Sequence, residues 1–311
     1  MSTLAPVPKT SHTTDSKPIV HEPIIDLSRN AQDHGWNWVT TIALSALHIG
    51  AVVALFFFTW KAFAVFCVTY VLGLYVGIGM CYHRLLTHRG YRVPRWLERC
   101  FAVLGCLSLQ GGPIFWVATH RVHHQLTDKP GDPHSPHDGG WWAHVGWILR
   151  GDALHHHEVL LERYAPDLVS QRFYRVLSRF HWVPLVILGL ALLWFGGWPS
   201  VLWGICLRVT LSQHSTWLVN SVTHMWGSRR FSTKDESRNN FLIALITGGE
   251  GWHNNHHAHP VSARHGLAWY EWDPNFYGIW LLEKLGLATR VNRALFDWSD
   301  PRPARSGRYV P

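Results

Sequence analysis

Three short clusters of histidine carry the side chains most able to do chemistry in this chain. They are His83-Arg-Leu-Leu-Thr-His88, His120-Arg-Val-His123-His124 and Gly-Glu-Gly-Trp-His253-Asn-Asn-His256-His257. Imidazole is the commonest side-chain metal ligand and suits iron, copper and zinc. Residues at i, i+3 and i+4 share one face of a helix, so we expect the second and third clusters each to direct three imidazoles at one point. The clusters hold eight histidines, which are too many for one ion and about right for two.

The first cluster has a different spacing. His83 and His88 are five residues apart, which places them about 140° apart around an α-helix. They can therefore converge only if the helix ends or bends between them.

The remaining histidines show that density alone does not identify a metal site. The densest run, His155-His156-His157, lies in a polar stretch (150–167) that predicts a solvated loop. His48, His181 and His214 lie in apolar runs, where packing and hydrogen bonding are the expected roles. A last set lies near the clusters and could orient ligand imidazoles: His134, His137, His144, His259 and His265.

The composition predicts a protein that is part membrane and part polar cap. The 311 residues carry a formal charge of +8, only 15% are charged, 47% are hydrophobic, and 19 are tryptophan. Tryptophan favours the membrane–water boundary, and a mean hydropathy of −0.02 excludes a chain made only of spans. The five cysteines form no C-x-x-C pair and are interpreted as reduced packing residues.

Four apolar runs, about 39–60, 62–82, 180–198 and 200–220, are each long enough to be a membrane span. The fourth contains Arg208, Gln213 and His214, which at that depth should face protein or a cavity. Two shorter segments, 96–109 and 141–149, are predicted to lie on the membrane surface. The predicted fold is therefore an all-α integral membrane protein, with four transmembrane helices and a cytoplasmic helical cap that holds the histidines.

The ends of the chain and the distribution of charge predict its orientation. Residues 1–35 form a polar tail expected to be disordered, residues 36–298 form the membrane domain, and residues 299–311 form a basic tail. Lysine and arginine are almost absent from the loops near Lys61 and Gly197. The positive-inside rule then places the histidine clusters and both termini in the cytoplasm.

The clusters and their surroundings resemble the membrane fatty acid desaturases, with stearoyl-CoA desaturase-like Δ9 enzymes among them. The resemblance runs from about residue 38 to 295 and includes Asp132-Pro-His-Ser, Trp141-Trp-Ala-His-Val-Gly-Trp and Trp217-Leu-Val-Asn220-Ser-Val-Thr-His224. It implies a di-iron site in which His224 is a ninth ligand and Asn220 acts through water. Thr119 stands where animal acyl-CoA desaturases have aspartate. In this respect the chain resembles cyanobacterial and plant enzymes more closely.

The resemblance implies an enzyme that introduces a cis double bond, at Δ9, into a saturated acyl chain linked to CoA or to lipid. An unactivated methylene offers nothing to acid–base or nucleophilic catalysis, whereas a redox metal with dioxygen can remove its hydrogens. Two iron ions, dioxygen and two external electrons are implied, with a ferredoxin or cytochrome b type donor and its reductase as partners beside the lipid bilayer. No nucleic acid partner is expected. A histidine-box hydroxylase or ketolase, and a membrane metal carrier, are the alternatives.

Two carboxylates and one helix face complete the predictions. Asp132 and Glu250 could orient ligand imidazoles, although a turn or cap role is equally open. Counting back from His83 at about 100° per residue, Leu72, Tyr75 and Gly79 fall on the metal-facing side of the second span. We predict that these three residues wall an acyl tunnel, with Tyr75 at its closed end and an ordinary packing tyrosine as the alternative.

Overall fold

The computed structural model describes residues 27–32, 35–151, 158–294 and 309–310. The predicted tails therefore lie almost wholly outside the described residues, and so does the run His155-His156-His157. The first half of the chain forms α1 (Arg29–Gln32), α2 (Trp38–Ala54), α3 (Trp60–Tyr70), the π-helix η1 (Val71–Thr87), α4 (Arg95–Cys106), α5 (Pro113–Leu126), the 3-10 helix η2 (Pro136–Asp138), the π-helix η3 (Trp142–Gly146) and α6 (Trp147–Leu149). The second half forms α7 (Glu158–Tyr164), α8 (Pro166–Val169), α9 (Arg172–Arg179), α10 (Val183–Val201), the π-helix η5 (Leu202–Leu207), α11 (Arg208–Met225), α12 (Phe241–Thr247), α13 (His253–Ala258), α14 (Pro274–Lys284) and the antiparallel pair β1 (Arg293–Ala294) and β2 (Tyr309–Val310).

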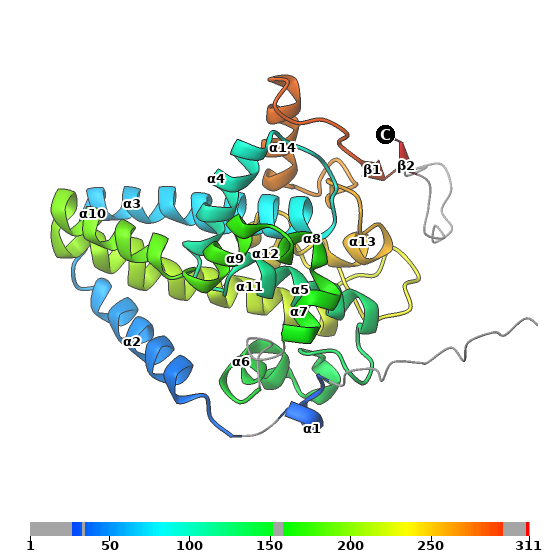
Figure 1. Cartoon of the computed structure of the whole chain (residues 1–311), viewed down its shortest axis with the longest axis horizontal. Coiled ribbons are helices and arrows are strands. Elements are labelled where there is room, and N and C mark those ends of the chain that lie inside the picture. Colours follow the sequence, from blue (N-terminus) through cyan, green and yellow to red (C-terminus); the bar gives the residue numbers. More distant parts are fainter. Residues whose placement is uncertain (1–26, 33–34, 152–157, 295–308, 311) are drawn as a thin grey trace, which may run out of the picture.

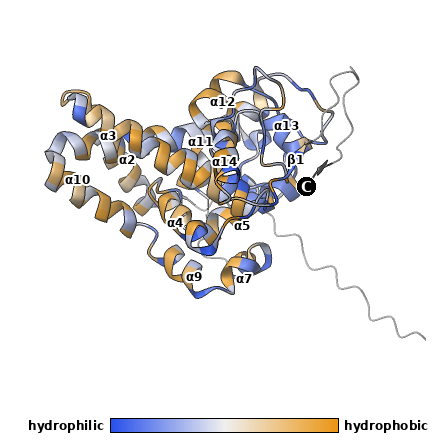
Figure 2. Cartoon of the chain, turned by 90° about the horizontal axis from the view of Figure 1, so that it is seen from above, coloured by the Kyte–Doolittle hydropathy of each residue, from blue (hydrophilic) through white to orange (hydrophobic). Residues whose placement is uncertain are grey.

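The long helices lie side by side and project from one end of a compact cap. Figure 1 shows α3, α10 and α11 running together, with α2 inclined to them, while α5, α13 and α14 lie at the other end. The projecting helices are mainly apolar, whereas α13 and the segments around it are polar (Figure 2). Two helical stretches, Trp60–Thr87 and Val183–Met225, are long and apolar enough to cross a membrane, and Trp38–Ala54 is a shorter apolar helix. Helices thus occupy all four predicted runs, while the number that cross a membrane stays a prediction.

Local capping sets where these helices begin and turn, and it corrects two predicted boundaries. The break between the first two runs comes at residues 55–59 instead of Lys61, because the Thr59 hydroxyl accepts the N–H of Ala62 and starts α3 there. Lys61 lies inside α3, and its Nζ donates to the Phe195 carbonyl at 2.6 Å. The second break comes at Gly197, whose φ of 67° is left-handed and suits a residue without Cβ.

The fourth run buries its polar side chains against protein, as expected. Arg208 is fully buried, and its guanidinium donates to the carbonyls of Leu107 and Gly204. Gln213 donates to the Leu109 carbonyl at 3.0 Å. The bonds to Leu107 and Leu109 satisfy carbonyls just beyond the end of α4 that have no helical partner.

A row of histidines attaches α2 to α11. The His48 Nδ1–H donates to the Leu44 carbonyl at 2.7 Å, and His48 Nε2 lies 2.9 Å from His214 Nε2. His214 Nδ1 lies 2.9 Å from His144 Nε2, and His144 Nδ1 lies 3.2 Å from the Ser221 hydroxyl. The packed, hydrogen-bonded role predicted for His48 and His214 is confirmed, and His144 belongs to this row rather than beside a metal ligand.

Candidate metal centre

The structure brings all nine predicted histidines together in two adjacent groups. Within each group the nearest ring nitrogens lie within 4.8 Å of one another. The first group contains five rings, from the end of η1, from α5 and from α13: His83, His88, His120, His124 and His256. The second contains four, from α5, α11 and α13: His123, His224, His253 and His257. Ring centroids of the two groups approach to 4.5 Å between His124 and His257.

The two triplets do not each converge on one point, which corrects the expectation from their spacing. In α5, His120 and His124 join the first group while His123 joins the second. In α13, His253 and His257 join the second group while His256 joins the first. Residues i and i+4 differ by about 40° around a helix, but i+3 and i+4 differ by about 100°. Each helix therefore lies between the two groups and contributes to both.

The first cluster converges because its helix is wound differently. The η1 helix is a π-helix with i→i+5 hydrogen bonds, and it ends at Thr87, next to His88. The N–H of His88 donates to the His83 carbonyl at 3.1 Å. In this geometry residues five apart lie nearly above one another, and the rings of His83 and His88 come to 4.9 Å.

Three rings of the second group donate Nδ1–H to a carboxylate. The pairs are His123 with Asp132 at 3.0 Å, His224 with Asp128 at 3.1 Å and His257 with Asp235 at 3.2 Å. A proton on Nδ1 leaves a lone pair on Nε2, so each carboxylate fixes the tautomer in which Nε2 can bind a metal. Burial opposes ionisation of Asp128, but its hydrogen bond with His224 lowers its pKa to about 2.

Glu250 fixes the tautomer of His83 in the first group. Its Oε2 accepts from His83 Nδ1 at 2.5 Å, and its Oε1 accepts from Arg84 at 2.9 Å and from Asn275 at 2.7 Å. Arg84 is fully buried and also pairs with Asp273 at 2.9 Å. Burial alone would raise the pKa of Glu250, but Arg84 and the nearby imidazoles hold it well below its usual range. Glu250 therefore remains an ionised acceptor.

Burial favours the neutral form of several rings in the two groups. Burial, with the neighbouring imidazoles, lowers the pKa of several rings well below the usual value of histidine: His88, His120, His124, His253 and His256. A neutral imidazole has the lone pair that a metal requires.

The inward nitrogens face one another in a way that suits bound cations. His253 Nε2 lies 3.0 Å from the Nε2 atoms of both His224 and His257. The last two already hold their proton on Nδ1, so the single proton of His253 can serve only one of these contacts. In the first group His256 Nε2 lies 3.0 Å from His83 Nε2 and 2.9 Å from His124 Nε2. Imidazole nitrogens are suitable ligands for iron, copper or zinc. A metal ion in each group would satisfy these nitrogens better than hydrogen bonds between the rings can.

Four carboxylates contact rings of the two groups. Asp132 and Glu250 were predicted to do so, and each accepts from one ring; the metal-binding role of these rings stays a prediction. The other two carboxylates, Asp128 and Asp235, were not predicted, because both lie in irregular segments where residue spacing does not show which way a side chain points. His134 lies beside Asp132 and His265 beside Glu250, at Nδ1–oxygen distances of 3.8 and 3.3 Å. His137 and His259 lie in neither group.

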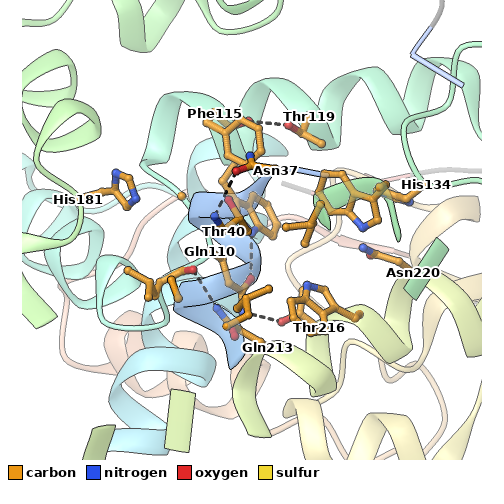
Figure 3. A pocket seen from close by; sticks show the side chains of 18 of the residues that line it. Asn37, Thr40, Gln110, Phe115, Thr119, His134, His181, Gln213, Thr216 and Asn220 are labelled. Carbon is orange, nitrogen blue, oxygen red and sulfur yellow. Dashed lines mark hydrogen bonds between the residues drawn. The ribbon is translucent and has the colours of Figure 1, made fainter. Parts of the chain in front are cut away.

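An apolar cavity of about 480 Å³ extends to these groups. His120 and Asn220 line its inner end, and Figure 3 shows His181 at the opposite end from Asn220 and His134. A second cavity, of about 40 Å³, shares Trp116, His120, Thr216 and Asn220 with the first and continues to His83 and His253. Between the two, Gln110 donates to the Thr216 hydroxyl at 2.9 Å and accepts from Trp116 Nε1 at 3.2 Å. The two cavities together pass beside the ligand rings.

The predicted tunnel residues have different positions. Gly79 lines the small cavity, together with Leu74 and Ile78. Tyr75 lies behind it, packed on Gly248, with its hydroxyl donating to the Leu245 carbonyl at 3.1 Å. Leu72 faces outward and is 36% exposed, because a π-helix turns less per residue than the α-helix used for the count. The tunnel role of Leu72, Tyr75 and Gly79 stays a prediction.

Comparison with known proteins relates the whole domain to one family. The family model for fatty acid desaturase matches residues 58–280. The chain is 43% identical over 260 residues to the sn-1 stearoyl-lipid 9-desaturase of Anabaena variabilis, covering 83% of this chain and 94% of that one. It is 43% identical over 255 residues to the sn-2 palmitoyl-lipid 9-desaturase of a Nostoc species, covering 82% and 90%. It is also 45% identical over 249 residues to the acyl-CoA C20 Delta5-desaturase of Anemone leveillei, covering 80% and 79%.

Proposed function

Because this chain belongs to the fatty acid desaturase family, we propose that it introduces a cis double bond at the Δ9 position of a saturated acyl chain. The chain is a membrane-bound oxidoreductase of the desaturase type, and its substrate is a fatty acyl chain. The Δ9 position is the one named for the Anabaena and Nostoc relatives. The observation that carries the proposal is the convergence of nine histidines beside an apolar cavity.

The proposed cofactor is a pair of iron ions, one in each histidine group. His83, His88, His120, His124 and His256 would hold one ion. His123, His224, His253 and His257 would hold the other, with Asn220 acting through water. When bound, the two irons supply the dioxygen-dependent oxidation that removes two hydrogens from neighbouring methylenes, using two electrons from outside.

Side chains around the metal centre orient the imidazoles and position the acyl chain. Asp128, Asp132, Asp235 and Glu250 each hold a proton on the Nδ1 of one ligand ring, which keeps Nε2 directed inward. The apolar cavity excludes water from the substrate methylenes. The hydrogen-bonded set of Gln110, Trp116 and Thr216 lies where the two cavities meet, and it would set which carbons lie beside His120.

The proposed topology has four spans, with the metal centre and both termini in the cytoplasm. The near absence of Lys and Arg around Lys61 and Gly197 supports it. The electron donor would then be a small cytoplasmic protein of the ferredoxin or cytochrome b type. Arg229 and Lys234 are exposed on the segment that carries Asp235, and they suit an acidic partner.

The function is tested by lipid analysis in a host without its own desaturase. Expression should yield monounsaturated chains that have lost two hydrogens, with the double bond at Δ9. Chains that gained an oxygen atom would identify a hydroxylase or ketolase instead. Bound metal without any altered chain would favour a carrier.

A variant links the activity to the metal centre. His256→Ala removes the ring that contacts both His83 and His124, and a vacated position is rarely refilled with the right geometry. The variant should remain in the membrane but lose iron and all desaturation. Two irons and full activity in this variant would refute the di-iron assignment.

A further inference from the structure

The larger cavity opens to the outside between two apolar helices. Only three of its lining residues are exposed: Val39 and Ala43 of α2 and Trp182, which precedes α10. Val39 is 83% and Trp182 49% exposed. Residues that line the rest of the cavity, such as Phe115 and Trp217, are buried. The opening therefore lies between the first turns of α2 and α10.

The two helices both contact η5 near one end, whereas their other ends are apart. Near the end of α2, Gly50 lies against Cys206 of η5, and Trp203 of η5 donates to the Ala54 carbonyl at 2.8 Å. On α10, Leu192 lies against Gly204 of η5. Both helices thus converge on η5, far from the histidine groups.

At its other end α2 is attached away from α10. The N–H of Asn37 donates to the Leu149 carbonyl at 2.7 Å, and His48 joins the row to His214 of α11. Within α2 and α10, both fully described, no hydrogen bond joins one helix to the other. The cavity occupies the space between their diverging ends.

The opening lies at the level where a membrane boundary is expected. Trp36 and Trp38 stand at the start of α2, and Trp182 at the start of α10. Tryptophan favours the interface, where one side of the ring is apolar and the other hydrated. The ester groups of glycerolipids lie at this same depth, on the side of the metal centre.

We propose that an acyl chain still esterified to a membrane glycerolipid enters sideways between α2 and α10; this rests on the proposed desaturase function. The chain would pass through the apolar cavity to His120 and Asn220. At the mouth, the amide oxygen of Asn37 accepts from the Thr40 N–H at 3.1 Å, which leaves its NH2 to donate to an ester carbonyl. The cavity lining contains no lysine or arginine, so its walls suit an acyl chain and not a phosphate group.

The test compares the two acyl carriers in vesicles. The iron-loaded protein, supplied with a reducing donor, is reconstituted with stearoyl phosphatidylcholine, and the double bonds are measured by gas chromatography. A parallel sample receives stearoyl-CoA in vesicles of ether-linked lipid. The chains of this lipid are not released as fatty acid esters, so any product measured there comes from stearoyl-CoA. Ala43→Trp and Val39→Trp narrow the opening. Ile42→Trp is the matched control, because Ile42 is 65% exposed on the same helix but does not line the cavity.

The expected result is desaturation of the lipid-linked chain, most of which is lost in Ala43→Trp and Val39→Trp but kept in Ile42→Trp. A phosphatidylcholine with a photoreactive acyl chain should label α2 and the segment around Trp182, and Ala43→Trp should lose this labelling. Desaturation of stearoyl-CoA alone, or unchanged lipid desaturation and labelling in the narrowed variants, would overturn side entry while leaving the desaturase function intact. No product from either carrier would instead overturn the proposed function.

Discussion

Replacing Glu250 with glutamine should release iron selectively from the five-histidine group. Oxygen Oε1 of Glu250 receives donors from Arg84 and Asn275, so the glutamine carbonyl must take that position. Its NH2 then faces His83 Nδ1, where the carboxylate oxygen had been an acceptor at 2.5 Å. His83 can accept from this NH2 only by moving its proton to Nε2, which removes the lone pair directed at the metal.

The size of the effect follows from the loss of one oriented ligand out of five. Removing the partner of a ligand histidine typically costs about 10- to 100-fold in metal affinity or activity, which corresponds to about 1.4 to 2.8 kcal/mol. The second group keeps all three of its carboxylate partners. Glu250→Gln should therefore retain about one iron per chain under chelation that leaves the wild type with two.

The assay is iron content after equilibration with graded concentrations of a chelator, followed by desaturase activity. Glu283→Gln is the matched control, because Glu283 of α14 pairs with Arg293 of β1, and neither residue belongs to a histidine group. Wild-type retention of both ions in Glu250→Gln would refute the argument from the tautomer of His83. Equal loss of both ions would show that Glu250 supports the whole cap rather than one ring.

Three further predictions concern other parts of the chain. Replacing His155, His156 and His157 together with alanine should leave iron content and activity near wild type, and loss of one iron would identify a ligand among them. Tyr75→Ala removes a side chain packed on Gly248 behind the small cavity, so the fatty acid profile should shift toward longer chains without moving the double bond. Val71→Ala, on the exposed side of the same helix, should leave the chain-length profile unchanged. In the metal-free folded protein, burial lowers the pKa of rings such as His88 and His120. Below about pH 6.5 the unfolded chain therefore binds more protons than the folded one. The urea midpoint of the metal-free protein should then fall as the pH drops from neutral toward 5. A midpoint that does not change with pH would contradict these shifts.

The sequence predicted which histidines lie together, but not how they are divided between the two groups. The three histidine clusters named eight of the nine rings, and the family resemblance added His224. The division of His120 and His124 from His123 could not be predicted, since it depends on where α5 lies relative to the two groups. That position is set by packing between segments distant in sequence.

The π-helix η1 explains one agreement and one difference. It ends at Thr87, between His83 and His88 as the spacing required, and its i→i+5 bonds bring the two rings together. The same winding moves Leu72 outward, while Leu74 and Ile78 line the cavity. A π-helix is rare and has no sequence signature comparable to that of an α-helix, so counting at about 100° per residue was the only available rule. Asp128 and Asp235 were not predicted for a related reason. Their segments are irregular, so no regular repeat shows which way a side chain points.

The histidine row between α2 and α11 has a direction, because each ring can give one hydrogen and receive one. The Leu44 carbonyl can only accept, so His48 must donate to it from Nδ1, and His214 must then donate to His48. The same order passes to His144, which donates from Nε2 to His214 and keeps a lone pair on Nδ1. The Ser221 hydroxyl, 3.2 Å from this Nδ1, donates to the Trp217 carbonyl at 2.8 Å. Burial lowers the pKa of His144, which keeps that ring uncharged. With three neutral rings, this is the one order that gives each ring–ring contact a single hydrogen, so the row fixes the tautomer of all three histidines as it attaches α2 to α11.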